Sequence, residues 1–211
     1  DMLFSRVETD TIFHEGTYAA RIFFDNRLRK TRIGNIQAFY TINDLRYPFD
    51  SLYSECDMEY LSYDTWDPNG NVKSKLYLTT WATYSEDPWY GDFAADTIVY
   101  SFSGWHILLF QVMDGRVRYF IDRQEAPLAE HRYSLLGSEV YPPSSMKISF
   151  INRITEKDNS VHDKNLPARQ SKMGVDWVYF MQDTCLTPKI VVRRIRDLRK
   201  AGISFLSTAV P

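Results

Sequence analysis

The sequence predicts an all-β protein built from antiparallel strands. Of its 211 residues, 15% are aromatic, and 14 Tyr, 13 Phe and 5 Trp give a composition that favours strands over helices. Short apolar or aromatic runs recur along the chain, and turn-forming residues separate them. This spacing is typical of antiparallel all-β proteins, which often reach this length as one domain.

The expected strands follow one another along most of the chain. They cover residues 16–24, 34–42, 54–61, 75–84, 97–102, 105–112, 116–122, 146–152 and 174–182. The run Met113-Asp114-Gly115 provides a tight turn, so we expect residues 105–112 and 116–122 to form a hairpin. A second turn is expected at Asp67-Pro68-Asn69-Gly70-Asn71.

Three segments interrupt this series of strands. Pro142-Pro143 breaks the chain before the strand at 146–152. Residues 155–172 are polar and nearly without aromatics, which predicts a long surface loop. Residues 126–136 fit either a short helix or an irregular connection, and the sequence leaves both open.

The C-terminal part differs in character from the rest of the chain. We expect residues 1–211 to form a single β-sandwich domain with a basic C-terminal extension at about 186–211. Within residues 191–200, Val192, Ile195 and Leu198 recur at roughly helical spacing among five Arg and Lys residues. Such a helix is a candidate for binding a partner or a membrane surface. A solvated face packed through its apolar stripe is commoner, and is the outcome we expect.

Composition and charge exclude several classes of function. A net charge of −2 and a pI near 6.1 give no global positive field, so nucleic acid is not an expected partner. The two cysteines provide no disulfide framework, and the four histidines show no metal-site spacing. No apolar run approaches the roughly 18 residues that span a bilayer, and no signal-peptide pattern opens the chain. Because the chain begins with Asp1, a leader removed earlier is compatible with the sequence.

The run Glu55-Cys56-Asp57-Met58-Glu59 alternates acidic and apolar residues. In an extended strand, successive side chains point to opposite faces, so the three acids share one face of the sheet. Like charges placed this close raise one another's pKa. A solvated edge of a half-buried strand is one explanation of the pattern, and acid/base chemistry is the one we favour.

Two carboxyl groups on either side of a sugar linkage are sufficient for glycoside hydrolysis. One attacks the anomeric carbon and the other protonates the departing oxygen, which makes Glu55 and Glu59 candidates. Their Cα atoms would lie about 13 Å apart on an extended strand, so both side chains must lean inward to reach the roughly 5 Å separation of a retaining enzyme. A proton shared along the row would keep one Glu protonated near neutral pH, as a general acid requires.

Residues 55–59 resemble the E-x-D-x-E signature of glycoside hydrolase family 16, which includes lichenases, laminarinases, agarases and carrageenases. The similarity continues in the same order along the chain. Residues 16–21 and 34–40 resemble two of the family's inner strands, 106–122 its strand, turn and strand, and 175–179 its closing D-W-V strand. The resemblance therefore covers about residues 5–182.

This resemblance implies a concanavalin-like β-jelly-roll sandwich of two curved antiparallel sheets, with a sugar cleft on the concave face. It implies that Glu55 is the nucleophile, Asp57 the assisting carboxylate and Glu59 the acid/base of a retaining mechanism. No cofactor is required for that chemistry. The resemblance also implies a structural calcium ion on the convex side, bound by Asp176 of the closing strand.

Further residues are expected to bind substrate. The resemblance places Arg6 in the cleft, where it could bind a sugar hydroxyl; a surface arginine is the equally weighted alternative. Strand alternation places five more side chains on the face of the acids: Tyr40, Tyr53, Tyr77, Thr79 and Trp81. Aromatic rings stack on the apolar faces of pyranose rings. Trp177 is expected in packing instead, whereas Trp66 and Trp89 are expected at the cleft rim.

The sequence departs from the family pattern at three positions. Val112 stands where an aromatic is usual, Arg123 replaces a glycine, and Arg153 stands where a cleft aromatic is often found. Arg153 could bind an anionic sugar such as a sulfated sugar or a uronate.

We therefore expect a retaining, endo-acting hydrolase of a β-linked polysaccharide of the β-glucan or galactan class. A non-catalytic carbohydrate-binding protein and a structural protein on the same fold are the alternatives. A polysaccharide or oligosaccharide is the expected partner, and a secreted, periplasmic or cell-surface location follows from that class.

Overall fold

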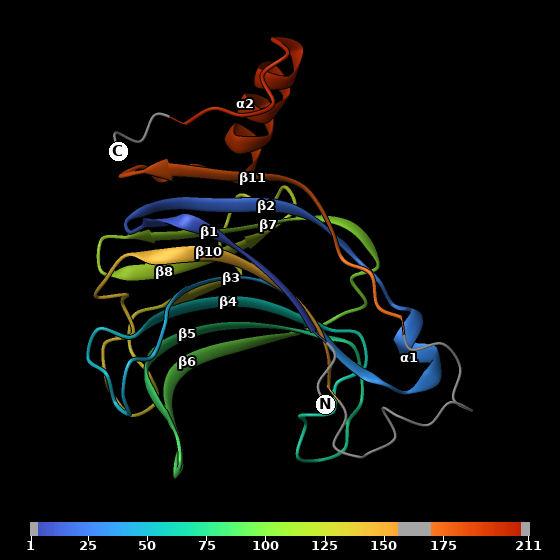
Figure 1. Cartoon of the computed structure of the whole chain (residues 1–211), viewed down its shortest axis with the longest axis vertical. Coiled ribbons are helices and arrows are strands. Elements are labelled where there is room, and N and C mark those ends of the chain that lie inside the picture. Colours follow the sequence, from blue (N-terminus) through green and yellow to red (C-terminus); the bar gives the residue numbers. More distant parts are fainter. Residues whose placement is uncertain (1–3, 156–169, 208–211) are drawn as a thin grey trace.

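The computed structural model describes residues 4–155 and 170–207, and these form two antiparallel sheets packed face to face (Figure 1). The strands, in chain order, are β1 Phe4–Phe13, β2 Gly16–Phe24, β3 Gly34–Asn43, β4 Ser54–Leu61, β5 Lys75–Glu86, β6 Trp89–Val99, β7 Gly104–Met113, β8 Arg116–Ile121, β9 Ala129–His131, β10 Met146–Thr155 and β11 Gly174–Gln182. One sheet has the strand order β1-β10-β3-β4-β5-β6 and the other β11-β2-β7-β8-β9. The predicted β-jelly-roll sandwich is confirmed.

The core lies between the two sheets. From β4, Cys56, Met58 and Tyr60 point into this core and have no solvent exposure. They belong to the same cluster as Tyr18 and Phe110 of the other sheet. Because side chains alternate along a strand, the odd-numbered residues of β4 point away from this core. The six-stranded sheet arches with its concave side away from β2 and β7 (Figure 1). Its concave face therefore carries the row of acids.

The predicted hairpin is present, since β7 and β8 pair across Asp114 and Gly115. One predicted strand is wrong, and one segment left open contains a strand. Residues 97–102 are not a strand of their own, because the strand β6 begins at Trp89 and ends at Val99. Residues 126–136 contain the short strand β9 rather than a helix, and it pairs with β8.

The strand β1 was not predicted. Most of its side chains are exposed, and Val7 and Ile12 lie among polar residues without forming an apolar run. Backbone pairing with β10 holds it at the edge of the six-stranded sheet, and its register shifts between Glu8 and Ile12. Such a bulge is common on edge strands, where it disfavours pairing with another chain.

Two helices complete the described part of the chain, α1 Arg27–Thr31 and α2 Pro188–Lys200. The helix α2 begins with Pro188, a residue favoured in the first helical turn. Its residues Ile190, Val191 and Ile195 pack against Leu109 and Phe120 on the outer face of the five-stranded sheet. The helix packs through an apolar stripe as expected, but the packed residues are Ile190, Val191 and Ile195 rather than the predicted Val192, Ile195 and Leu198. In the described ranges, no helix has the length and apolar character needed to cross a bilayer.

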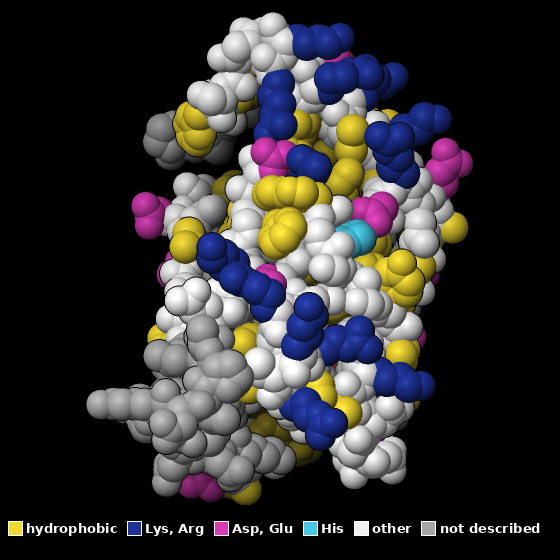
Figure 2. All heavy atoms as spheres, turned by 90° about the vertical axis from the view of Figure 1, so that its right-hand side faces the viewer, with side chains coloured by type: hydrophobic (Ala, Val, Ile, Leu, Met, Phe, Trp, Pro, Cys, Tyr) yellow, Lys and Arg dark blue, Asp and Glu magenta, His cyan; other side chains and the backbone are white. Residues whose placement is uncertain are grey.

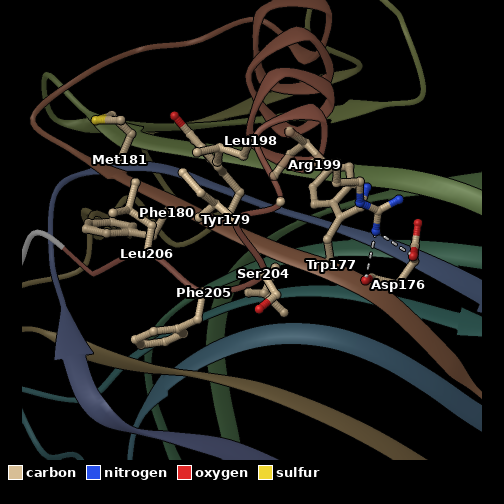
Figure 3. Close-up of a pocket in the computed structure, with 14 residues that line it drawn as sticks. Asp176, Trp177, Tyr179, Phe180, Met181, Leu198, Arg199, Ser204, Phe205 and Leu206 are labelled. Atoms are coloured by element: carbon tan, nitrogen blue, oxygen red, sulfur yellow. Dashed lines mark hydrogen bonds and ion pairs between the residues drawn. The ribbon is translucent and has the colours of Figure 1, made fainter.

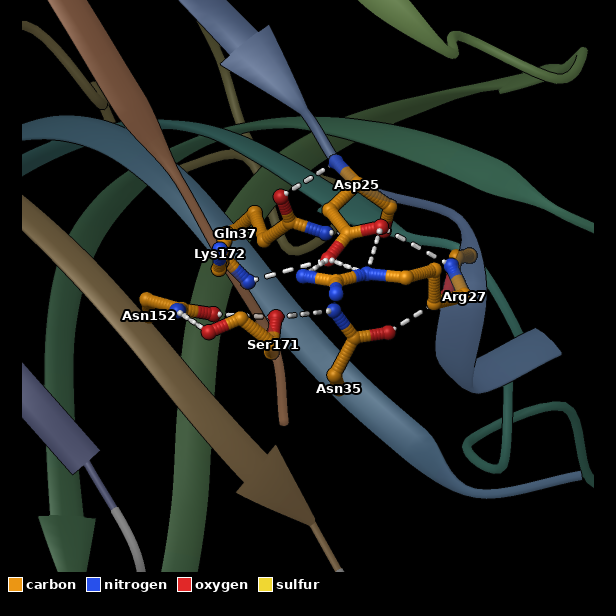
Figure 4. A network of polar contacts seen from close by, with 8 residues as sticks. Asp25, Arg27, Asn35, Gln37, Asn152, Ser171 and Lys172 are labelled. Carbon is orange, nitrogen blue, oxygen red and sulfur yellow. Dashed lines mark hydrogen bonds and ion pairs between the residues drawn. The ribbon is translucent and has the colours of Figure 1, made fainter. Parts of the chain in front are cut away.

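A polar network joins the end of β2 to β3, β10 and the segment before β11 (Figure 4). The Asp25 carboxylate accepts hydrogen bonds from Arg27 and, at 3.1 Å, from the backbone N–H of Lys172. Burial acts against ionisation of Asp25, but these hydrogen bonds outweigh it and lower its pKa. The Ser171 hydroxyl donates to Asn152 at 2.7 Å. The network thus fixes residues 171–172 beside the sheet that carries the acids. Most of the loop predicted at 155–172 lies outside the described residues.

Candidate functional site

The three acids lie on β4, which is an inner strand of the six-stranded sheet. On β5, their cross-strand neighbours are Trp81 beside Glu55, Thr79 beside Asp57 and Tyr77 beside Glu59. On the other side, Tyr40 of β3 lies beside Asp57. The register predicted from strand alternation is therefore confirmed for Tyr40, Tyr77, Thr79 and Trp81.

Hydrogen bonds connect the acids to aromatic side chains. The indole N–H of Trp81 donates to Asp57 Oδ2 at 2.8 Å, and Asp57 is only 3% exposed. The hydroxyl of Tyr53, a residue buried at 3% exposure, donates to Glu55 Oε2. The Asp57 carboxyl group also donates a hydrogen bond to Glu55. Within the described ranges, Glu59 has no hydrogen bond of this kind.

Burial raises the pKa of all three carboxyl groups, and repulsion from neighbouring carboxylates adds to it for Glu55 and Asp57. Burial is the larger cause for Glu55, followed by the charge of Glu59, and together they raise its pKa to about 8. Burial raises the pKa of Glu59 to about 7, although the positive charge of Arg153 acts in the opposite direction. Burial, followed by the charges of both neighbours, raises the pKa of Asp57 well above its ordinary value. The row therefore holds protons near neutral pH.

The hydrogen bonds make the two glutamates unequal. Glu55 accepts from Tyr53 and from Asp57, and donors of this kind stabilise a carboxylate. Glu59 lacks such donors among the described side chains. The pKa values of about 7 for Glu59 and about 8 for Glu55 favour the first negative charge on Glu59, whereas the donors to Glu55 favour it on Glu55. After the row has lost one proton, the two glutamates therefore share the remaining proton.

The two arginines that were predicted to bind substrate lie on neighbouring strands, β1 and β10. The Arg6 guanidinium lies 5.7 Å from the centre of the Tyr40 ring and 2.6 Å from Glu8 Oε2. The Nε atom of Arg153 is buried without a hydrogen-bond partner in the described structure. The structure thus brings Arg153 close enough to influence Glu59 electrostatically, which the sequence did not predict.

Other aromatic side chains extend the site. The rings of Trp81 and Phe93 lie 4.6 Å apart, and Tyr84 contacts both Trp81 and Tyr53. Sequence reasoning missed Phe93 and Tyr84; recognising the alternation of residues 89–99 as a strand would have placed Phe93 beside Trp81. The ring of Trp66 lies 5.6 Å from that of Tyr77, which agrees with the expected place of Trp66 at the rim.

The surroundings of Asp176 do not fit the calcium ion that the resemblance implies. Its Oδ2 atom lies 2.8 Å from Arg21 and its Oδ1 atom 2.7 Å from Arg199. Both guanidinium groups lower the pKa of Asp176 by hydrogen bonding. Calcium requires six to eight oxygen ligands, whereas two cations occupy this carboxylate. In the described ranges, no group of three or more His, Cys, Asp or Glu residues could hold a metal ion.

Comparison with protein-family models and with curated protein sequences found no match. Solved structures do resemble this one. A family 16 endo-glucanase from Bacteroides ovatus aligns with a TM-score of 0.58 and 15% identity, covering 84% of this chain and 74% of that chain. The β-glucanase of Bacillus licheniformis aligns with a TM-score of 0.55 and 13% identity, covering 84% and 71%.

A third similar structure belongs to work on endo-acting O-glycanases of the human gut microbiota, with a TM-score of 0.57 and 12% identity. This chain spans 61% of the length of that protein, and 84% of this chain is covered. At such identities, likeness in structure establishes the fold. The fold of this chain is the β-sandwich found in enzymes of glycoside hydrolase family 16.

Proposed function

We propose that this protein is a retaining, endo-acting glycoside hydrolase that cleaves a β-linked glucan. The observation that carries the proposal is the row of Glu55, Asp57 and Glu59 on the concave face, in which the two glutamates are electrostatically coupled and differ in their hydrogen bonds. The family 16 endo-glucanases that share this fold support both the reaction and the substrate class.

In the first step, the Glu55 carboxylate attacks the anomeric carbon while the Glu59 carboxyl group protonates the glycosidic oxygen. The bond between the anomeric carbon and that oxygen breaks, the leaving sugar departs as an alcohol, and an ester to Glu55 forms. In the second step, Glu59 accepts a proton from water, and the hydroxide attacks the anomeric carbon. The ester bond breaks and Glu55 is again a carboxylate.

Asp57 and Trp81 support this cycle. The Trp81 indole N–H holds the Asp57 carboxyl group, and Asp57 in turn hydrogen-bonds Glu55. These bonds fix the orientation of the nucleophile and stabilise its charge when the ester breaks. Tyr53 contributes a second donor to Glu55.

The aromatic side chains around the acids are suited to bind sugar rings. Trp81 and Tyr77 are half-buried beside Glu55 and Glu59, so one ring surface of each can contact substrate. Thr79, Tyr40 and Arg6 supply polar groups on the same face. Because β4 has strands on both sides, sugars can bind on both sides of the cleaved bond, as an endo-acting enzyme requires.

The proposal is tested by incubating the protein with mixed-linkage and β-1,3-glucans, agar, porphyran and carrageenans, and by measuring new reducing ends. We expect the wild type to cleave a β-glucan. The rate of cleavage by Glu55→Gln should be at least about 1000-fold lower than that of the wild type. Glu139→Gln, an exposed residue away from the acids, serves as the matched control and should be as active as the wild type.

Activated substrates test the roles of the two glutamates separately. An aryl glycoside with a good leaving group needs no protonation, so Glu59→Gln should still form the ester with it, whereas Glu55→Gln should not. Equal loss on both substrate types would contradict the assignment of Glu59. If no glucan is cleaved but one binds at micromolar concentration, the protein is a carbohydrate-binding protein on this fold. Because polymeric glucans lie outside the cell membrane, we propose a secreted, periplasmic or cell-surface location.

A further inference from the structure

A second concave site lies on the opposite side of the sandwich from the acids, between α2 and the five-stranded sheet. It is a pocket of about 530 Å³ whose lining includes Arg21, Arg123, Arg196, Arg199 and Lys200. Asp176 is its one carboxylate. Five positive side chains against one negative leave four positive charges uncompensated, although the whole chain carries a net charge of −2. Figure 2 shows Lys and Arg side chains gathered over α2 on this side of the molecule.

Two of these arginines are held in place before any ligand arrives. Arg21 lies between Asp176, at 2.8 Å, and the ring of Trp105, whose centre is 4.8 Å from the guanidinium carbon. Arg199 bonds the other oxygen of the same carboxylate, as Figure 3 shows. Each guanidinium has five N–H donors in a fixed plane, so both retain donors that Asp176 does not use.

The other cations of the pocket have few internal partners. In the described ranges, Arg123 and Lys200 form no ion pair, and Arg196 approaches only Asp197, at 3.6 Å. Planar guanidinium groups bind carboxylate and sulfate oxygens in pairs of hydrogen bonds. The pocket is therefore suited to an anion with several oxygen atoms.

The floor of the pocket is apolar, and this restricts the ligand further. It includes Trp177, Ile107 and Val192, all of which are partly buried. An indole ring packs well on the apolar face of a sugar ring. The apolar residues of α2 already pack on the sheet, which leaves the helix without an apolar face for a lipid bilayer.

We propose that this pocket is a second binding site for an acidic oligosaccharide, whose sugar ring lies on Trp177 and whose sulfate or carboxylate group is bound by Arg123, Arg196 and the two arginines on Asp176. The inference depends on the proposed function only for the choice of a glycan as the ligand. Positive charge thus occupies the position where the resemblance implied a bound cation.

The test measures direct binding, so that it does not depend on cleavage. Three oligosaccharides of equal length are titrated by calorimetry into the Glu55→Gln protein: a neutral β-glucan, the same glucan sulfated, and an oligoglucuronate. We expect at least one acidic ligand to bind, and the double variant Arg123→Gln/Arg196→Gln to bind it about tenfold or more weakly, because charge-assisted hydrogen bonds are lost. Neither residue contacts Asp176, so the anchor of α2 remains.

The matched control is Lys189→Gln/Arg193→Gln, which removes the same charge from exposed positions of α2 outside the pocket. This control should weaken binding by less than about threefold, because it changes only the net charge of the protein and removes no group from the pocket. Equal weakening in both double variants would show a diffuse charge effect and overturn the site. The site would also be overturned if the protein bound only the neutral glucan or bound none of the three ligands. The same holds if, in a parallel titration, duplex DNA bound more tightly than either acidic glycan. Failure of catalysis would leave this result unaffected.

Discussion

The raised pKa values of Glu55 and Glu59 predict that the folded protein loses stability as the pH rises. Both groups hold a proton in the folded protein at a pH where the unfolded chain has released it. This contribution is fully present below about pH 4.5, and it is lost as the pH rises through the folded pKa values of about 7 and about 8.

The magnitude follows from the shifts themselves. Raising a carboxyl pKa from 4.5 to about 7 corresponds to about 3 kcal/mol of unfolding free energy, and raising it from 4.5 to about 8 to about 5 kcal/mol. Because both side chains are only half-buried, water offsets part of this cost, and we expect about 4 kcal/mol in all between about pH 5 and about pH 8. For a chain of this size, that lowers Tm by about 10 °C.

The assay is denaturation by urea over that pH range for the wild type and for Glu55→Gln/Glu59→Gln. The double variant cannot ionise at these positions, so its stability should vary with pH much less than that of the wild type. The control Glu125→Gln/Glu139→Gln removes two exposed carboxylates and should keep the pH dependence of the wild type. A wild type whose stability is constant between about pH 5 and pH 8, or a double variant with an unchanged slope, would refute the reasoning.

Three further predictions follow from the same contacts. The pH profile of kcat/KM should be bell-shaped, rising as the pair of glutamates loses its first proton near pH 7 and falling as it loses the second near pH 8; a flat profile from about pH 6 to pH 9 would contradict a shared proton. Trp81→Phe removes the donor to the buried Asp57, so kcat should fall by roughly tenfold and the free energy of unfolding by about 1–3 kcal/mol, measured by steady-state kinetics and urea denaturation. Asp25→Asn should lower the unfolding free energy by about 1–3 kcal/mol near neutral pH, and because the pKa of Asp25 is lowered in the folded protein, this difference should shrink as the pH falls below about 4; a difference that is constant with pH would argue against an ionised Asp25.

The sequence was sufficient to predict the face on which each residue of β4 lies. Alternation along one strand is a local property, and at residues 55–59 the acids and the apolar residues alternate without interruption. The same argument placed Trp81, Thr79 and Tyr77 correctly, because they alternate on the next strand along the chain. The face on which a side chain lies could thus be predicted where it depends on residues close in the sequence.

Contacts that depend on pairing between strands distant in the sequence could not be predicted in this way. The strand β1 is polar and exposed, and only its ladder with β10, nearly 140 residues away in the chain, makes it a strand. The hydrogen bond from Trp81 to Asp57 depends on the rotamers of both side chains as well as on register. The two arginines on Asp176 come from β2 and α2, so nothing local to residue 176 indicated that cations would occupy its carboxylate.

The position of β4 within its sheet has a consequence for how this protein can evolve. Backbone ladders on both flanks fix the strand that bears the acids, whereas the connections at its two ends lie outside those ladders. Insertions or deletions in these connections can reshape what surrounds a ligand while the spacing of the carboxyl groups stays constant. Preference for one polymer over another can therefore drift between descendants of the chain while the reactive centre is inherited intact.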